Sequence, residues 1–261
     1  MKNLFSLEGK TVAVIGAGSG IGRSVAQGAA QHGANVVCLD VKADAAAETA
    51  EGITSLGCSA SSGKCDITDL TSVRDRMVDA ASKNGIHGVV CTPAINVRKP
   101  ILQYTSEEFA RVVNVNLQGN FNVLQAAGQL MTQQGFGSIV LFSSIRSITT
   151  EHGQSVYSMT KAGIVQLVKT AATEWGTKGV RVNAVGPGVI ETPLTEPIKQ
   201  NKDWYNAYAM KNPMNRWAQS SEMAGPTIFL LSDAASYVTG TILFADGGWL
   251  AADGRFTPPG M

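Results

Sequence analysis

The sequence has few of the residues from which metal centres and disulfides are built. Its 261 residues contain four cysteines and three histidines; no two cysteines form a C-x-x-C pair, and the histidines are scattered. This scarcity predicts a reduced protein without a metal site. Long hydrophobic runs are missing too: no apolar segment approaches the ~20 residues that cross a bilayer, and the N-terminus holds no apolar signal core. We therefore expect a cytoplasmic protein with no membrane partner.

An excess of charge of one sign is also missing. Lysine and arginine number 21 against 20 acidic residues, a net charge of +1, so nothing indicates nucleic acid as a partner. Hydrophobic residues make up 44% of the chain, enough for a substantial core. A chain of this length forms one large α/β domain or two small ones. Because no linker rich in proline, glycine or serine divides it, we expect a single domain over residues 1–261.

Short β-branched runs alternate with longer segments rich in alanine, leucine and glutamine. This alternation predicts βαβ units and hence a parallel sheet with helices on both faces. The expected strands are 11–15, 35–39, 88–91, 138–142, 180–185 and 241–244, with a further strand before Asp66, and the expected helices include 21–31, 70–82, 106–131 and 157–175.

One stretch, about 190–218, breaks this rhythm with prolines, aromatic residues, mixed charges and no strand pattern. It follows the end of a strand, which is where ligands bind in open α/β sheets. We therefore predict a mobile substrate loop with short helices. The alternative is a surface insertion without function.

The first expected strand runs directly into a glycine-rich turn, Gly16-Ala17-Gly18-Ser19-Gly20-Ile21-Gly22, which opens the first helix. Glycines at such a place permit a tight turn and let the backbone approach a pyrophosphate, which then lies against amides at the helix N-terminus. The position between a strand and a helix makes this a strong indication of a dinucleotide site.

Two aspartates follow the next strands. Asp40 ends the second strand, where a carboxylate accepts hydrogen bonds from the adenosine ribose and repels a 2′-phosphate, so it favours NAD over NADP. The alternative is a turn or helix N-cap aspartate. Lys42 lies two places on, but we expect the carboxylate to dominate. Asp66 is a candidate for the adenine edge, or equally the cap of the next helix.

Tyr157 and Lys161 stand four residues apart at the head of a helical stretch, which puts both on one helix face. A phenol titrates near ~10 and is a poor base at neutral pH, but a nearby ammonium and the positive nicotinamide of NAD lower its pKa. Ser144 follows the 138–142 strand, at the sheet edge where a reacting carbonyl would lie. The alternative for the Tyr–Lys pair is an ordinary exposed helix pair.

Taken together, these residues resemble the short-chain dehydrogenase/reductases over essentially the whole chain. The matching pieces are Gly16–Gly22, Asp66, Val115-Asn116-Leu117, Ser143-Ser144, Tyr157-x-x-x-Lys161, Arg181-Val182-Asn183, Pro187-Gly188 and Asp246-Gly247-Gly248. The resemblance implies a Rossmann-like, doubly wound parallel sheet of about seven strands, and an NAD-dependent dehydrogenase that acts on a secondary alcohol, hemiacetal or ketone. It also implies direct hydride transfer, which needs no metal.

The resemblance also assigns roles to single residues. Tyr157 exchanges the hydroxyl proton, Ser144 hydrogen-bonds the reacting oxygen, Lys161 holds the nicotinamide ribose and lowers the pKa of Tyr157, and Asn116 keeps a water in the proton relay. The implied cofactor-binding set is Gly16, Ser19, Gly20, Ile21, Gly22, Asp40, Asp66, Ile67, Ala94, Tyr157, Lys161, Pro187, Gly188, Ile190 and Thr192.

The chain departs from the family pattern at two places. Ile15 replaces the usual threonine before the first glycine, and Cys91-Thr92-Pro93-Ala94 replaces the family's N-N-A-G after the fourth strand. The catalytic residues are intact, which argues against the alternative outside the enzymes, an NAD(H)-binding regulatory protein without turnover.

Arg146 follows Ser144 by two residues, close enough to reach a substrate. Its planar guanidinium suits a carboxylate, sulfonate or phosphate; the alternative is a salt bridge to Glu151 or to a neighbouring subunit. With Arg98 and Gln154, it makes the expected pocket polar and cationic, whereas a steroid or long acyl chain needs an apolar one. We therefore predict a small-molecule substrate such as a sugar, a polyol or an anionic sugar. The alternatives are a 3-oxoacyl-thioester or a hydroxysteroid.

The helices expected over 106–131 and 157–175 carry more apolar positions than contact with one sheet uses. In the family these helices pair across a two-fold axis, so we expect a homotetramer or a homodimer. The tail 249–261 extends past the usual family ending, where it covers a neighbour's active site or packs on the surface.

Overall fold

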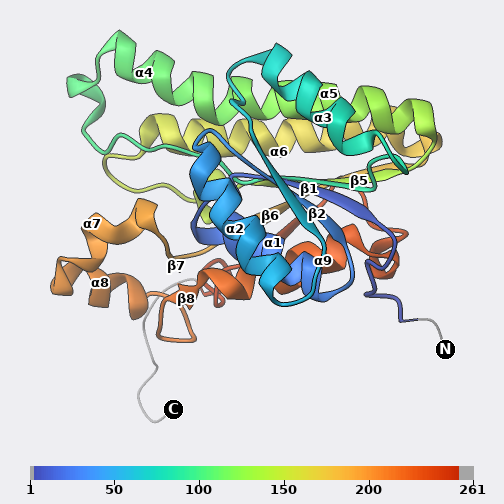
Figure 1. The fold of residues 1–261 in the computed structure, drawn as a ribbon. Coiled ribbons are helices and arrows are strands. Elements are labelled where there is room, and N and C mark those ends of the chain that lie inside the picture. The colour runs from blue at the N-terminus through green and yellow to red at the C-terminus, as the bar shows by residue number, and fades with distance from the viewer. Residues whose placement is uncertain (1–2, 253–261) are drawn as a thin grey trace.

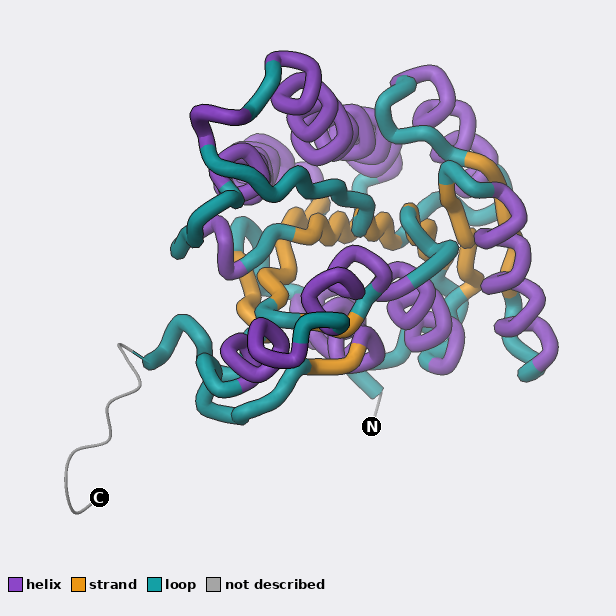
Figure 2. The backbone as a smooth tube through the Cα atoms, turned by 90° about the vertical axis from the view of Figure 1, so that its left-hand side faces the viewer, coloured by secondary structure: helices purple, strands orange, loops and turns teal. Residues whose placement is uncertain are grey.

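Seven strands form one parallel sheet between two layers of helices in the computed structural model, which describes residues 3–252 (Figures 1 and 2). The strand order is β3-β2-β1-β4-β5-β6-β9, and this confirms the expected Rossmann-like fold. The strands are β1 (Thr11–Ile15), β2 (Asn35–Asp40), β3 (Ala60–Lys64), β4 (Gly88–Cys91), β5 (Gly137–Phe142), β6 (Val180–Pro187), β7 (Ile190–Glu191), β8 (Ala218–Gln219) and β9 (Ile242–Ala245). The helices are α1 (Gly20–Gln31), α2 (Ala43–Ser55), α3 (Leu70–Ala81), α4 (Ser106–Val113), α5 (Gly119–Gln134), α6 (Ser155–Trp175), α7 (Glu196–Lys199), α8 (Lys202–Ala209) and α9 (Ala224–Leu231).

The central strands are buried on both faces, and each face has its own core. Because side chains alternate along a strand, Ala13 and Ile15 of β1 enter the core beneath α3, α5 and α6, whereas Val12 and Val14 enter the core beneath α1, α2 and α9. Figure 2 shows the sheet between these two layers. Continuous apolar strands are what a parallel sheet covered on both faces requires.

The sheet reverses its direction of winding next to β1. From β1 the chain builds outward through β2 and β3, then returns to β4 on the other side of β1. Loops that leave β1 and β4 at their carboxyl ends therefore diverge and leave a crevice, which is where ligands bind in such sheets.

The prediction of one continuous helix over 106–131 is wrong. A π-helical segment, Asn114–Gln118, separates α4 from α5. A π turn keeps the path of a helix while it shifts the hydrogen-bond ladder by one residue, so the apolar period of the sequence hardly reveals it.

The segment 190–218 contains the expected short helices, but it is not free of strands. Its two ends, β7 and β8, pair in a small parallel sheet beside the main one (Figure 1). Tyr205 stacks on Trp217 with ring centroids 4.9 Å apart, and Tyr208 meets Trp249 edge-on at 5.8 Å. The segment therefore has an aromatic core of its own. Trp249 begins the predicted tail, of which 253–261 lie outside the described residues.

Within residues 3–252, no helix combines the length and the apolar character that crossing a bilayer would require.

Candidate active site

A cavity of about 720 Å³ lies at the crevice beside β1. Thr92 and Pro93, from the segment that departs from the family pattern, line it together with most of the predicted cofactor set: Gly16, Ser19, Gly20, Ile21, Gly22, Asp40, Asp66, Ile67, Ala94 and Thr192. The remaining predicted cofactor residues lie elsewhere: Tyr157 and Gly188 line a neighbouring cavity, Ile190 lines a third, Lys161 is buried in α6, and Pro187 lines none of these three.

The floor of this cavity is made of backbone that leaves no room for side chains. A Cβ atom on Gly22 would lie 2.0 Å from the carbonyl oxygen of Gly16, and one on Gly16, where φ is +86°, would lie 2.3 Å from the Thr92 hydroxyl. The Thr92 hydroxyl and amide both donate to the carbonyl oxygen of Ile15, at 3.0 and 3.1 Å. Thr92 thus closes the glycine-rich turn from β4.

Asp40 spans the gap between the glycine-rich turn and the start of α2. Its carboxylate oxygens accept hydrogen bonds from the amides of Gly18 and Lys42, both at 3.0 Å. Lys42, not Asp40, is the N-cap of α2, so Asp40 combines a turn contact with a place in the cavity wall. Of the nearby cations, Lys42 lines the cavity, whereas Arg23 binds the Gly18 carbonyl and Glu48 instead.

Asp66 is not the cap of the next helix, which was the alternative to an adenine contact. Asp69 caps α3 by accepting from the Thr71 amide, while Asp66 accepts from the amide and hydroxyl of Thr68 at 2.9 and 2.7 Å. The Asp66 side chain therefore stabilises the loop that forms this end of the cavity.

Ser144, Tyr157 and Lys161 come together where β5 ends and α6 begins. The Lys161 ammonium lies 5.5 Å from the centre of the Tyr157 ring and donates to the carbonyl oxygen of Phe142 at 2.8 Å. The Ser144 oxygen accepts from the Arg146 amide at 3.1 Å, which leaves its hydroxyl hydrogen available for donation.

The two titratable groups of this trio are shifted in opposite directions. Burial raises the pKa of Tyr157, and the hydrogen bond with Ser144 and the charges of Arg146 and Arg98 oppose that rise. Burial lowers the pKa of Lys161 to about 8. The charges of Arg146 and Arg98 thus favour the phenolate, and the lowering of the Tyr157 pKa by Lys161 stays a prediction.

Asn116 lies in the π-helical segment and is fully buried. Its side-chain amide donates to the Ile95 carbonyl and accepts from the Ile95 amide, both at 2.8 Å. From the π turn, Asn116 therefore holds the loop after β4 in place through its two hydrogen bonds to Ile95. π turns are frequent at functional sites.

A second cavity, of about 470 Å³, contains the predicted substrate residues. Ser144 and Tyr157 line it together with Arg98, Arg146 and Gln154. Its other wall comes from the 190–218 segment and carries Trp204, Tyr208 and Trp217. The structure therefore places the three predicted substrate residues beside Ser144 and Tyr157, and aromatic residues of the predicted substrate loop form the facing wall.

The predicted substrate residues also share a partner. Arg146 forms the ion pair with Glu151 that was the alternative to substrate binding, and Arg98 and Gln154 bind the same carboxylate. The arginines thus line the cavity and are already paired within the protein.

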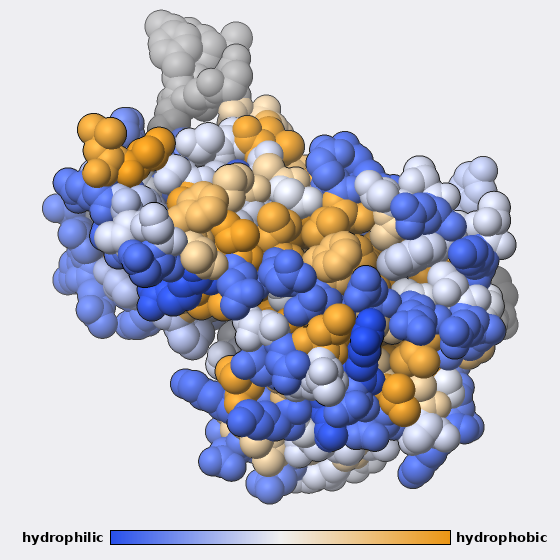
Figure 3. All heavy atoms as spheres, turned by 90° about the horizontal axis from the view of Figure 1, so that it is seen from above, coloured by the Kyte–Doolittle hydropathy of each residue, from blue (hydrophilic) through white to orange (hydrophobic). Residues whose placement is uncertain are grey.

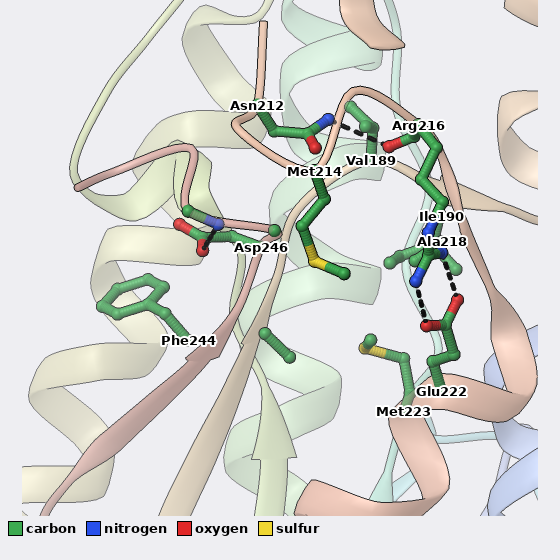
Figure 4. Close-up of a pocket in the computed structure, with 13 residues that line it drawn as sticks. Val189, Ile190, Asn212, Met214, Arg216, Ala218, Glu222, Met223, Phe244 and Asp246 are labelled. Atoms are coloured by element: carbon green, nitrogen blue, oxygen red, sulfur yellow. Dashed lines mark hydrogen bonds and ion pairs between the residues drawn. The ribbon is translucent and has the colours of Figure 1, made fainter. Parts of the chain in front are cut away.

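A third cavity, of about 510 Å³, adjoins the substrate cavity and shares Val189 with it. Met214 and Met223 point into it from two different segments, and Arg216 pairs with Glu222 at its rim (Figure 4). None of the predicted catalytic residues lines this cavity.

Comparison with known proteins places the chain among oxidoreductases. The sequence model of the family described as enoyl-(acyl carrier protein) reductase matches residues 16–250. L-rhamnose 1-dehydrogenase (NAD(P)(+)) of a Sphingomonas species is 37% identical over 93% of this chain and 96% of its own. Gluconate 5-dehydrogenase of Gluconobacter oxydans is 32% identical over 94% and 96%. The 3-oxoacyl-(acyl-carrier-protein) reductase of Thermotoga maritima is 36% identical over 93% and 98%.

Solved structures agree with this placement. A short-chain type dehydrogenase/reductase from Mycobacterium marinum superimposes with a TM-score of 0.91 at 34% identity, covering 95% of this chain and 98% of the other. A gluconate 5-dehydrogenase from Burkholderia cenocepacia in complex with NADP and tartrate superimposes with a TM-score of 0.92 at 30% identity, with the same coverage.

Proposed function

The chain belongs to the short-chain dehydrogenase/reductase family, and from this premise we propose that it is an NAD-dependent dehydrogenase of a polyhydroxy acid or a related sugar. As a member it is an oxidoreductase that acts on CH–OH groups. The observation that carries the proposed substrate class is the pair Arg98 and Arg146 in the wall of the cavity that Ser144 and Tyr157 line. Guanidinium groups bind carboxylates through paired, charge-assisted hydrogen bonds.

The larger cavity suits a dinucleotide. No side chain stands on its floor at Gly16 and Gly22, so a ligand can approach the backbone there closely. The pyrophosphate would lie against the amides that open α1, and Asp40 and Asp66 would lie at the adenosine end. When bound, the nicotinamide supplies the acceptor or donor of the hydride.

In the chemical step, Tyr157 moves the proton. The Ser144 hydroxyl donates a hydrogen bond to the reacting oxygen of the substrate, and the Tyr157 phenolate takes the hydroxyl proton as a general base. Lys161 binds on the ribose side, and its positive charge, with those of Arg98 and Arg146, favours the phenolate. Asn116 holds the loop after β4 at its place beside this relay.

The names of relatives support the substrate class. Two relatives are named for gluconate, one of them holds tartrate, and a third is named for rhamnose. All of these are polyhydroxy compounds, and gluconate and tartrate carry carboxylates. A 3-oxoacyl-thioester substrate is the second candidate, because the Thermotoga relative is named for it and the family model is named for another acyl-carrier-protein substrate.

The experiment for the substrate is a comparison of matched pairs. The purified protein with NAD is offered aldonates and the alditols of the same length and configuration, and NADH formation is followed by absorbance. We expect aldonates to be oxidised with the higher kcat/KM. A protein that reduces an acetoacetyl thioester and leaves every aldonate and alditol unchanged would establish the second candidate.

NAD as the cofactor is proposed from Asp40, whereas NADP is the cofactor bound in three solved relatives. If one repelled phosphate costs at least about 1.4 kcal/mol, kcat/KM should favour NAD roughly tenfold or more. Asp40→Ala should narrow this ratio, and Asp44→Ala, an exposed carboxylate in the first turn of α2, should not. Equal efficiency with both cofactors would contradict the assignment.

We also propose that the protein works as a homotetramer or homodimer. Phe109 of α4 and Phe121 of α5 are 45% and 42% exposed, and an open groove of about 360 Å³ runs between α5 and α6 beside Leu167. Figure 3 looks onto the side that carries α3, α4 and α5, where apolar residues gather between polar ones. Light scattering at micromolar concentration should show an oligomer.

A further inference from the structure

One carboxylate, that of Glu151, joins the segments that surround the substrate cavity. One of its oxygens accepts from Arg98, Gln154 and Tyr208, and the other accepts from Arg146. Arg98 follows β4, Arg146 and Gln154 belong to the β5–α6 connection, and Tyr208 belongs to α8. Glu151 therefore ties the 190–218 segment to the two arginines.

Glu151 does not line the cavity itself, whereas Arg98 and Arg146 do. The residues that line the cavity include no other charged side chain. Two guanidinium charges thus line the cavity, and the Glu151 carboxylate, which is not among the lining residues, pairs with both. Arg98, Arg146 and Glu151 together carry a net charge of +1.

The hydrogen bonds of this wall leave one donor and one acceptor unused. Arg146 is only 5% exposed, and its Nη1 atom is buried without a hydrogen-bond partner among the described residues. The same holds for the Oδ1 atom of Asn96, whose Nδ2 donates to Gln154. Both residues line the cavity. Burying such groups unpaired costs free energy unless a ligand completes them.

We propose that Glu151 determines which substrate charge the cavity prefers. Because its carboxylate cancels one of the two arginine charges, the cavity is selective for monoanions over dianions. The inference rests on the proposed function, a dehydrogenase of polyhydroxy acids. Nη1 of Arg146 takes the carboxylate, and Oδ1 of Asn96 accepts from a hydroxyl group. Sugars with one carboxylate and free hydroxyl groups match this pair of contacts.

Electrostatics and packing act together in this arrangement. Burial would raise the pKa of Glu151, but the hydrogen bonds from Tyr208, Arg98 and Gln154 and the charge of Arg146 outweigh it and keep the pKa below its usual range. The carboxylate is therefore ionised at neutral pH. Arg98 also stacks over Trp204 at 5.0 Å, and Arg146 lies 5.4 Å from the centre of the Trp249 ring. Both guanidinium groups are thus held in place before a substrate arrives.

The test uses three six-carbon probes that differ in charge: D-glucitol, D-gluconate and D-glucarate. Binding to the full chain with NADH is measured by calorimetry, so that the readout does not need turnover. The unchanged protein should bind gluconate more tightly than glucitol or glucarate. In Glu151→Gln, which keeps the size of the side chain and removes its charge, the affinity for glucarate relative to gluconate should rise about tenfold or more.

Three further variants separate charge from packing. Arg98→Gln brings the net charge of the wall to zero, so the preference for gluconate over glucitol should fall. Tyr208→Phe removes one hydrogen bond to Glu151 without a change of charge, so the ratio of glucarate to gluconate affinity should stay as in the unchanged protein. Glu191→Gln, a carboxylate that binds Tyr205 and Lys199 outside the cavity wall, should also leave it unchanged.

Two results would overturn the inference, and they can be told apart. A gluconate preference in the unchanged protein with an unaltered glucarate ratio in Glu151→Gln would overturn the role of Glu151 alone. Equal binding of gluconate and glucitol by the unchanged protein would overturn the proposed substrate class together with this inference.

Discussion

The cofactor cavity and the substrate cavity are lined by different parts of the chain: backbone forms the floor of the first, and side chains form the wall of the second. The cofactor cavity has a backbone floor: glycines approach one another too closely for any side chain, and Thr92 seals the turn through contacts to the Ile15 carbonyl. The substrate cavity has a side-chain wall, in which residues from separate segments meet at Glu151. The cofactor cavity depends on the backbone conformation of the glycine-rich turn. The substrate cavity depends on how segments that are distant in the sequence pack against one another. Changes of shape should therefore damage cofactor binding, and changes of charge should alter substrate choice.

The largest effect is expected at Tyr157, which lines the substrate cavity. Tyr157→Phe removes the proton acceptor, so turnover should fall by about 10²–10⁴-fold while the affinity for NADH stays measurable. The matched control is Tyr237→Phe, because Tyr237 is fully exposed. Since burial raises the pKa of Tyr157 and the phenolate is the active form, the rate of alcohol oxidation should rise with pH. Substantial turnover in Tyr157→Phe would mean that another group is the base.

Gly22→Ala tests the backbone floor. The added methyl would lie 2.0 Å from the Gly16 carbonyl oxygen, so the turn must open, and we expect NADH affinity to fall by about a hundredfold. Gly225→Ala in α9 is the matched control, since a methyl there meets nothing within 4 Å and alanine is the better helix former. Unchanged NADH affinity in Gly22→Ala, measured by fluorescence titration, would show that the cofactor does not lie on this turn.

The smallest effect is expected on stability, at Lys161. Its pKa of about 8 lies below the ordinary 10.5, so the folded protein binds fewer protons there than the unfolded chain between these two values. The stability of the unchanged protein therefore rises as pH increases through this window, and the burial cost is greatest at pH 8 and below. Lys161→Met removes the buried charge and should melt at an equal or higher temperature at neutral pH, although it is inactive.

Melting curves at several pH values check this account of Lys161. The advantage of the methionine variant should fade as pH rises from about 8 toward 10. A variant that is equally destabilised at every pH would show instead that the hydrogen bond from Lys161 to the Phe142 carbonyl outweighs the cost of burial.

The difference between the cavities also explains what the sequence could predict. The glycine-rich turn, Asp40 and the Tyr157–Lys161 pair are local patterns with fixed spacing, and the structure places the turn and Asp40 in the lining of one cavity and Tyr157 in the lining of the next. The central strands were predictable because their β-branched runs are buried on both faces of the sheet, whereas β3 has no β-branched residue and was expected only from its place before Asp66. The π-helical segment was not, since it leaves the apolar period nearly intact.

Side-chain partners across the substrate cavity were harder to predict. Two opposite interpretations of Arg146 were left open, and the structure combines them: the arginine lines the cavity and pairs with Glu151. No spacing in the sequence reveals that Tyr208 reaches the same carboxylate, because α8 and the β5–α6 connection meet only in the folded protein. The pairing of β7 with β8 was missed because two-residue strands carry no alternation.

The central claim, that a guanidinium charge selects an acidic polyol, is tested most directly at Arg146. The measurement is kcat/KM for an aldonate and for its matched alditol, in the unchanged protein and in Arg146→Ala. We expect the aldonate value to fall by about one to two orders of magnitude, the worth of a charge-assisted hydrogen bond of ~1.5–3 kcal/mol, with a smaller loss for the alditol and NAD affinity unaltered. Equal losses for the charged and the neutral substrate, or full activity in Arg146→Ala, would contradict the claim.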